Sequence, residues 1–176
     1  ALELINNAEN EFTSFKDLSK GEIKIGCSTT LTKLILIDAI KKFHDEYPNI
    51  NINITNDLTY NLINNLKLGK LDFVIFNESN VKETNLNLQQ IKKLKQGFIY
   101  NPKFYDDKVT DFKDLNNVPL ILQKEEANSR KLLDYIALQH NVKLMPSMEV
   151  ASQELITEFV NIGLGIGFVI IDLATR

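Results

Sequence analysis

Three consecutive hydroxyl side chains follow a predicted strand and could bind a small anion. Glu22–Gly26 is predicted as a short strand, and Ser28, Thr29 and Thr30 come next, where a long helix is predicted to begin. The first N–H groups of a helix have no partner within it, and the helix dipole favours negative charge there. The turn is therefore predicted to bind a ligand, although Ser and Thr are also the usual residues that cap a helix.

Further polar side chains stand where strands end or helices begin. Asn77 follows the predicted central strand Leu71–Phe76, at the edge where open α/β sheets bind ligands, or it is a turn asparagine. Thr59 comes after the second strand and either reaches the ligand or caps the next helix. Asn128 and Ser129 stand at the start of a later helix.

Arg130 and Cys27 are two further candidates for a functional role. The role of Arg130 is open between two interpretations, whereas one interpretation is favoured for Cys27. The guanidinium of Arg130 could form a charge-assisted bond to a ligand, or it could pair with a carboxylate such as Glu149. Cys27 has no histidine beside it that would activate it as a nucleophile. It is interpreted as a small buried residue at the end of its strand.

The sequence carries no catalytic or metal-binding motif. It contains no G-x-S-x-G, C-x-x-C, H-E-x-x-H or P-loop pattern. Gly163, Gly165 and Gly167 are spaced like part of a dinucleotide fingerprint but lack its strand–turn–helix context, so they are interpreted as close helix–strand packing. We therefore expect a binding protein without catalytic residues, cofactor or metal.

Composition narrows the class of protein further. The chain has 176 residues, 44% hydrophobic and 24% charged, enough for one domain or two small lobes. Its net charge of −3 argues against binding of nucleic acid by this chain alone, because such binding needs a clustered basic surface. A single cysteine fits a reducing cytoplasm, and the absence of an apolar run of about 18 residues predicts no membrane contact.

The hydrophobic pattern predicts strands and helices in alternation. Pro48 ends the first long helix, and Ile50, Ile52 and Ile54 alternate with asparagines as in a half-buried strand. Such alternation implies right-handed βαβ crossovers and two α/β units with a ligand cleft between them. Helices are predicted at residues 1–18, 30–47, 60–68, 129–140 and 152–160, and strands at 22–26, 49–55, 71–76, 86–91, 97–100, 118–122, 144–150 and 163–171.

Taken in order, several of these segments resemble the effector-binding domain of LysR-type transcriptional regulators. The resemblance covers nearly the whole chain, and although each motif is weak alone, the ordered set is fairly specific. It departs from the family where Ile170, Ile171 and Asp172 stand in place of a usual proline. The segments that carry it are Gly21–Gly26, Phe43–Pro48, Leu66–Ile75, Ser129–Arg130, Glu149 and Val160–Gly167.

The resemblance implies two Rossmann-like subdomains joined by crossover strands, related to periplasmic type 2 solute-binding proteins. It implies that Ser28, Thr29 and Thr30 are the main effector contact of the first subdomain, with Asn128 and Ser129 opposite. Residues 1–18 would then be the end of a linker helix, 19–97 the first subdomain, 98–171 the second and 172–176 the start of a crossover back. A return segment completing the first subdomain is expected to be missing after Arg176.

The same resemblance implies partners. The effector would be a small, anionic metabolite, and the chain would form a homodimer or homotetramer. DNA would be bound only through an N-terminal helix-turn-helix missing from this chain. The competing hypothesis is a solute-binding protein of a transport system, which shares the fold, and a less favoured one is a cytoplasmic enzyme.

Overall fold

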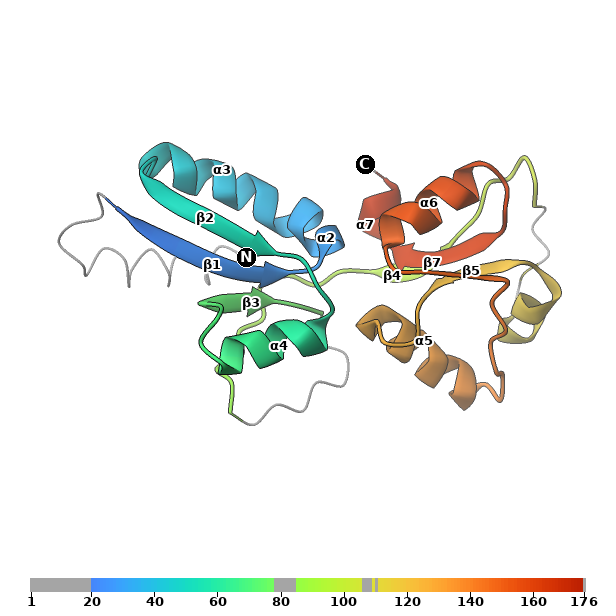
Figure 1. The fold of residues 1–176 in the computed structure, drawn as a ribbon. Coiled ribbons are helices and arrows are strands. Elements are labelled where there is room, and N and C mark those ends of the chain that lie inside the picture. The colour runs from blue at the N-terminus through green and yellow to red at the C-terminus, as the bar shows by residue number, and fades with distance from the viewer. Residues whose placement is uncertain (1–19, 78–84, 106–108, 110, 176) are drawn as a thin grey trace. The chain divides into compact units, whose positions relative to one another are not determined.

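The computed structural model describes residues 20–77, 85–105, 109 and 111–175, which form two compact α/β units (Figure 1). Among these residues, the first unit comprises 20–76 with 85–93, and the second comprises 77 with 94–175. The predicted α/β class with two subdomains is confirmed. The predicted linker helix at 1–18 lies outside the described residues, and the subdomain boundaries at 18, 97 and 171 stay predictions.

The first unit is built on a parallel sheet of three strands in the order β2-β1-β3. Strand β1 is central, and its Ile23 and Ile25 are buried while Lys24 between them is exposed. Ile23 lies opposite Ile52 of β2, so the alternating isoleucines share one face. The elements are β1 (Gly21–Cys27), α2 (Thr29–Leu31), a π-helical segment (Thr32–Leu36), α3 (Ile37–Glu46), β2 (Ile50–Thr55), α4 (Thr59–Lys67) and β3 (Phe73–Ile75).

Helices α3 and α4 cover opposite faces of this sheet (Figure 1). On the α3 face, Phe43 and Ile40 meet the isoleucines of β1 around an apolar hollow. On the α4 face, Gly26 leaves room for Leu62 and Leu71, because a Cβ there would lie 2.7 Å from the Leu71 side chain. The predicted single helix over 30–47 is in fact α2, the π segment and α3 in succession.

The second unit has a mixed sheet of four strands in the order β4-β7-β5-β6. Strands β5, β6 and β7 are parallel, and β4 runs antiparallel to β7. The elements are β4 (Gln96–Ile99), a 3-10 helix (Phe112–Asn117), β5 (Leu120–Gln123), α5 (Asn128–Gln139), β6 (Met148–Val150), α6 (Gln153–Asn161), β7 (Ile166–Ile170) and α7 (Ile171–Ala174).

Two apolar clusters lie on the two faces of this sheet. Leu122 of β5 packs with Leu133 of α5, whereas Ile121 packs with Ile156 and Val160 of α6. Consecutive residues of a strand point to opposite faces, so β5 supplies both clusters. All of these side chains are nearly inaccessible, and burying each contributes about 1.5–3 kcal/mol. Figure 1 shows α5 and α6 on opposite sides of the sheet accordingly.

The two units repeat one connectivity. In each, the first parallel strand is central, the next strand pairs on one side of it, and the third pairs on the other. The helices that follow the first two strands therefore lie on opposite faces. Such a reversal opens a crevice at the carboxyl ends of the strands, the usual ligand position in open α/β sheets.

Some predicted elements differ from the structure. The predicted strand at 86–91 is wrong, because Leu88 is exposed and the segment has no buried face to hold it in a sheet. The predicted strand at 144–150 shrinks to β6, since Pro146 lacks the N–H that a sheet partner needs. β7 begins only at Ile166, because Gly163, with φ of 84°, forms the turn that ends α6.

Candidate functional site

The turn after β1 uses Ser28 as a helix cap. The Ser28 hydroxyl accepts a hydrogen bond from the Leu31 amide at 3.2 Å. The Ser28 carbonyl accepts bonds from the Thr32 amide at 2.9 Å and from the Thr32 hydroxyl at 2.8 Å. Ser28 therefore shapes the turn, and its hydroxyl has only part of its bonding capacity left for a ligand.

Thr29 presents the open groups of this turn. Its side chain is exposed, and in the described part of the chain neither its hydroxyl nor its backbone amide has a hydrogen-bond partner. The Thr30 amide is likewise unbonded among these residues, while the Thr30 side chain is buried. One hydroxyl and two amides at a helix start are suited to an anion or another strong acceptor.

Asn56 follows β2 and links its end to the turn after β1, and the sequence interpretation missed it. Its side-chain amide donates to the Cys27 carbonyl at 2.9 Å and to the Thr32 hydroxyl at 3.2 Å. It ties the end of β2 to the hydroxyl turn. The signal existed in the sequence, because Asn56 follows a strand that pairs with β1, just as Asn77 follows β3 on the other side.

Thr59 stands at the first position of α4, at the same edge of the sheet, and is half-buried. The interpretation of Thr59 as a helix cap is wrong. Leu58 occupies the cap position, and the Asp57 carboxylate accepts bonds from the Leu58 amide at 2.7 Å and from the Asn61 side chain at 2.9 Å. Thr59 already lies one residue inside the helix, so its hydroxyl is not at the cap position, and no side chain caps α4.

Cys27 is completely buried at the end of β1, as expected. Burial raises the pKa of its thiol to about 11, and a hydrogen bond with Thr32 offsets part of that rise. The charged thiolate is disfavoured in this apolar setting, so the thiol is protonated at neutral pH and is a poor nucleophile.

The raised pKa makes a testable link to alkaline stability. The folded thiol holds its proton more tightly than the unfolded one, so its contribution is fully present below pH 9 and lost as pH rises toward 11. We expect the free energy of unfolding of the wild type, relative to Cys27→Ala, to fall by about 2 kcal/mol across that window. Urea unfolding of both proteins between pH 7 and 11 measures this, and a constant difference would contradict it.

In the second unit the structure brings three predicted residues together. The Asn128 side-chain amide donates to the Asn77 carbonyl at 3.1 Å. Ser129 is buried, and its hydroxyl accepts a bond from the Gln153 side chain at 3.1 Å. The predicted set thus separates into Ser28, Thr29, Thr30 and Thr59 on the first unit, and Asn77, Asn128 and Ser129 on the second.

Gln153 is a second residue that the sequence interpretation missed. It is buried at the first position of α6, and its amide donates to Ser129 and to the Gln123 side chain, each at 3.1 Å. Its carbonyl accepts from the Ile170 amide at 2.7 Å. One side chain therefore joins β5, α5, α6 and β7 at the carboxyl edge of the sheet. A lone glutamine carries no sequence pattern that would have revealed this.

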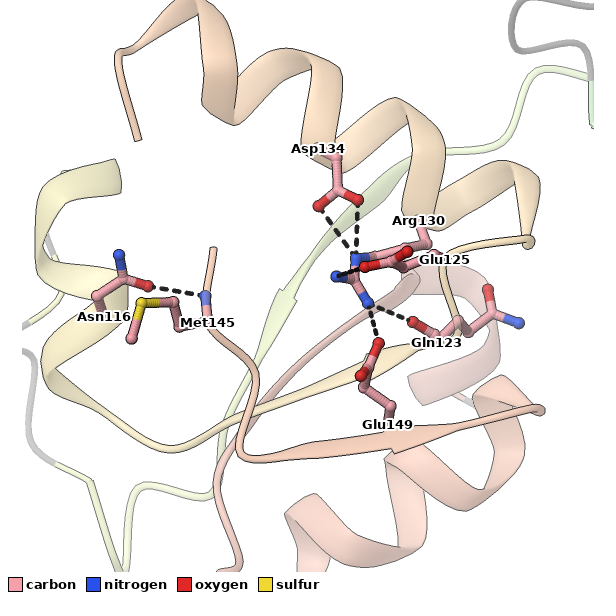
Figure 2. A network of polar contacts seen from close by, with 7 residues as sticks. All are labelled: Asn116, Gln123, Glu125, Arg130, Asp134, Met145 and Glu149. Carbon is pink, nitrogen blue, oxygen red and sulfur yellow. Dashed lines mark hydrogen bonds and ion pairs between the residues drawn. The ribbon is translucent and has the colours of Figure 1, made fainter. Parts of the chain in front are cut away.

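Arg130 is fixed by neighbouring acceptors, as Figure 2 shows. Its Nε lies 3.0 Å from each carboxylate oxygen of Asp134, and its Nη1 donates to the Gln123 carbonyl at 2.8 Å and to Glu149 at 2.7 Å. Burial alone would lower the pKa of Arg130, but the bonds to Glu149 and Asp134 outweigh it and raise the pKa. Of the two interpretations left open, structural pairing is the one the geometry favours.

The described part of the chain has neither a metal-binding cluster nor a membrane-spanning helix. Within residues 20–77, 85–105, 109 and 111–175, no three His, Cys, Asp or Glu side chains gather where they could hold a metal ion. No helix in that same part of the chain is both long and apolar enough to span a membrane.

Solved structures with the same fold include three regulators. HinK from Pseudomonas aeruginosa, a LysR family transcriptional regulator, is 21% identical with a TM-score of 0.69, over 96% of this chain and 59% of HinK. The effector-binding domain of QuiR in complex with shikimate is 18% identical with a TM-score of 0.71, over 90% and 78%. The regulatory domain of CcmR from Synechocystis PCC6803 in complex with 2-PG is 15% identical with a TM-score of 0.66, over 86% and 73%.

At these low identities the TM-scores show a shared fold and nothing more, and the chain spans only 59% of the length of HinK. The family itself is shown by a sequence model described as the LysR substrate binding domain, which matches residues 16–176. The match confirms the resemblance on which the sequence prediction rested and favours a regulator over a transport protein. The chain belongs to the family of LysR substrate-binding domains.

Proposed function

We propose that this chain is the effector-sensing part of a larger LysR-type transcriptional regulator and binds a small anionic metabolite. The observation that carries the proposal is the turn after β1, where the Thr29 hydroxyl and the amides of Thr29 and Thr30 have no partner in the described structure. The family match supplies the class of protein, and the open donors supply the chemistry of the ligand.

The predicted effector contacts form two half-sites, which differ in how many free hydrogen-bond donors they have. The first half-site is Ser28, Thr29, Thr30 and Thr59 on the first unit, and the second is Asn77, Asn128 and Ser129 on the second unit. On the first unit, donors converge around Thr29, and Asn56 holds the turn in place through Cys27 and Thr32. On the second unit, Asn128 and Ser129 already have hydrogen bonds, so that half-site is pre-formed by its own contacts. A pre-formed site spends less binding energy on ordering its side chains. Contact of one effector with both units remains a prediction from the family resemblance.

The remaining partners belong to the same proposal. DNA binding would reside in an N-terminal helix-turn-helix of the full-length regulator, acting in the cytoplasm as a homodimer or homotetramer without enzymatic activity. Effector binding would shift the population of arrangements of these subunits. QuiR and CcmR structures hold shikimate and 2-PG, which makes small anionic metabolites the first molecules to test on this chain.

A substitution at Thr29 tests the proposed ligand contact most directly. In Thr29→Leu, an apolar side chain replaces the free hydroxyl and blocks the two amides, so we expect effector-induced stabilisation to disappear. At a ligand concentration of 100 Kd the wild type would gain about 2.7 kcal/mol. Thermal unfolding with a panel of metabolites that includes shikimate and small phosphorylated acids measures the gain.

Thr175→Leu serves as the matched control, because Thr175 is exposed and lies in neither half-site. It should retain the full stabilisation. Equal stabilisation of Thr29→Leu and the wild type by the same metabolite would place the site elsewhere. No stabilisation of the wild type by any anion of the panel would remove the support for an anionic effector.

A further inference from the structure

Three buried acceptor atoms in the described part of the chain have no hydrogen-bond partner, and all belong to one edge of the second sheet. They are the side-chain carbonyl of Gln96 and both carboxylate oxygens of Glu154. Gln96 begins β4, opposite Ile170 at the end of β7. Glu154 lies in the first turn of α6, which starts at that same edge. Acceptors without donors in one region indicate that a donor is missing there.

Gln153 links the start of α6 to Ser129 of the second half-site. This glutamine precedes Glu154 in α6, accepts from the Ile170 amide and donates to the Ser129 hydroxyl. Ser129 is one of the predicted effector contacts. The unpartnered oxygens therefore belong to the edge at which the second unit is expected to meet its ligand.

The neighbouring cation is already committed elsewhere. Arg130, next to Ser129, bonds through Nε to Asp134 and through Nη1 to Glu149, and its Nη2 lies 4.0 Å from Glu125. Three carboxylates around one guanidinium leave an excess of negative charge beside the half-site. An anionic group of a ligand would be repelled there, whereas a cationic group would be attracted.

The start of α6 does not satisfy Glu154 either. A helix dipole favours a carboxylate in the first turn, but it supplies no hydrogen bond by itself. The Leu155 amide, which could have donated, bonds instead to the Ser152 hydroxyl at 3.3 Å. Glu154 is half-buried, but both of its oxygens are inaccessible and have no donor, which is unfavourable for a polar group.

Resting on the proposed effector-sensing function, we propose that the second half-site accepts a protonated amine or another cationic N–H group of the effector, with Glu154 as its acceptor. An ammonium group has three donors, which suits both oxygens of Glu154 and a nearby carbonyl. The effector class would then be a metabolite that carries a cationic nitrogen in addition to an anionic group, such as an amino acid. Glu154 would be a specificity-determining residue.

The first test needs no ligand. Glu154→Gln removes the unpaired charge but keeps the size of the side chain, so we expect the thermal midpoint of the free protein to rise by about 2–4 °C. Glu158→Gln makes the same charge change at an exposed position of the same helix and should leave the midpoint unchanged. An unchanged or lower midpoint in Glu154→Gln would show that Glu154 already has a stabilising partner, and the proposal would fall.

The second test compares matched probes in which a hydroxyl replaces the amine: alanine and lactate, aspartate and malate, phenylalanine and phenyllactate, ethylamine and ethanol. At least one amine should raise the midpoint of the wild type and of Glu158→Gln more than its hydroxyl partner does. This preference should be lost in Glu154→Gln. Equal shifts within every pair, or no shift by any amine, would overturn the proposal.

The outcomes separate this inference from the proposed function. Hydroxy acids that stabilise the wild type as well as amino acids do, and that lose their effect in Thr29→Leu, would support the sensing function and reject the amine. Amines whose effect depends on Glu154 but not on Thr29 would support the amine contact and reject the anion-binding turn.

Discussion

Replacing Arg130 with methionine is expected to lower the free energy of unfolding of the second unit by about 2–3 kcal/mol. Removing one partner of a buried ion pair usually costs about 3–5 kcal/mol, because the other charge is left without compensation. Here the Arg130 side chain is 4% exposed, but Asp134 and Glu149 are 41% and 43% exposed and regain part of their hydration. The expected loss is therefore at or just below the lower end of that range.

Two further variants show which property of the arginine matters. Arg130→Lys keeps the positive charge but loses the planar fork that serves Asp134, Glu149 and the Gln123 carbonyl together, so an intermediate loss is expected. Glu125→Gln removes only a distant, exposed partner and should cost below about 0.5 kcal/mol.

Urea unfolding followed by circular dichroism measures these losses. The difference in the free energy of unfolding between the wild type and Arg130→Met should change little with added salt. The reason is that salt screens the buried Arg130 charge only weakly. A loss below about 1 kcal/mol in Arg130→Met would mean that the network contributes no more than an exposed ion pair does. It would also reopen Arg130 as a ligand contact.

Replacing Gly167 with alanine is the second change expected to be severe, with a loss of about 2–3 kcal/mol. A Cβ at this position would lie 2.3 Å from the Cγ2 of Ile156 and 3.0 Å from the Cγ2 of Val160. Both methyl groups branch directly from helix Cβ atoms, so they cannot swing aside. Helix α6 would have to move away from β7, and Gln153 would move with it.

A double variant isolates this cause. In an Ile156→Ala background the clashing methyl is gone, so Gly167→Ala should cost less than about 1 kcal/mol there. Gly21→Ala is the control for glycine replacement in a strand, since a Cβ on Gly21 would meet nothing within 4 Å and its effect should be small. Additive losses in the double variant would show that contact with Ile156 is not the reason Gly167 must be glycine.

The fold was largely predictable because its signals are local and periodic. Alternating isoleucines at 50–54 and the apolar run at 71–76 each specify a strand, and Pro48 specifies where the first long helix stops. Of the three glycines expected to mark close helix–strand packing, Gly167 does so against Ile156 and Val160 of α6. A Cβ on Gly163 would instead meet Phe104, and one on Gly165 the Pro119 carbonyl, so that interpretation is wrong for these two. The strand predicted at 86–91 is absent, because a short stretch with few apolar side chains does not reveal whether a sheet will bury them.

The site was less predictable because its groups are defined by pairing over long sequence separations. Asn56 and Gln153 organise the two edges; Asn56 had a positional signal at the end of a strand, whereas Gln153 had no pattern in the sequence. Arg130 could be assigned only once Asp134, Glu149 and the Gln123 carbonyl were placed around it. Position on the chain indicated the edge of the sheet, and only geometry identified the partners.

The π-helical segment Thr32–Leu36 determines how the preceding turn, Ser28–Thr30, is rotated relative to α3. Its wide turn holds one residue more than an α-helical turn would, and each residue of an α-helix advances the chain by about 100°. If that extra residue were deleted while α3 stayed packed on its sheet, Thr29 and Thr30 would be rotated about the helix axis. Their hydroxyl and amide groups would then point in another direction. The direction in which the turn offers its donors therefore depends on the length of a segment that need not touch the ligand.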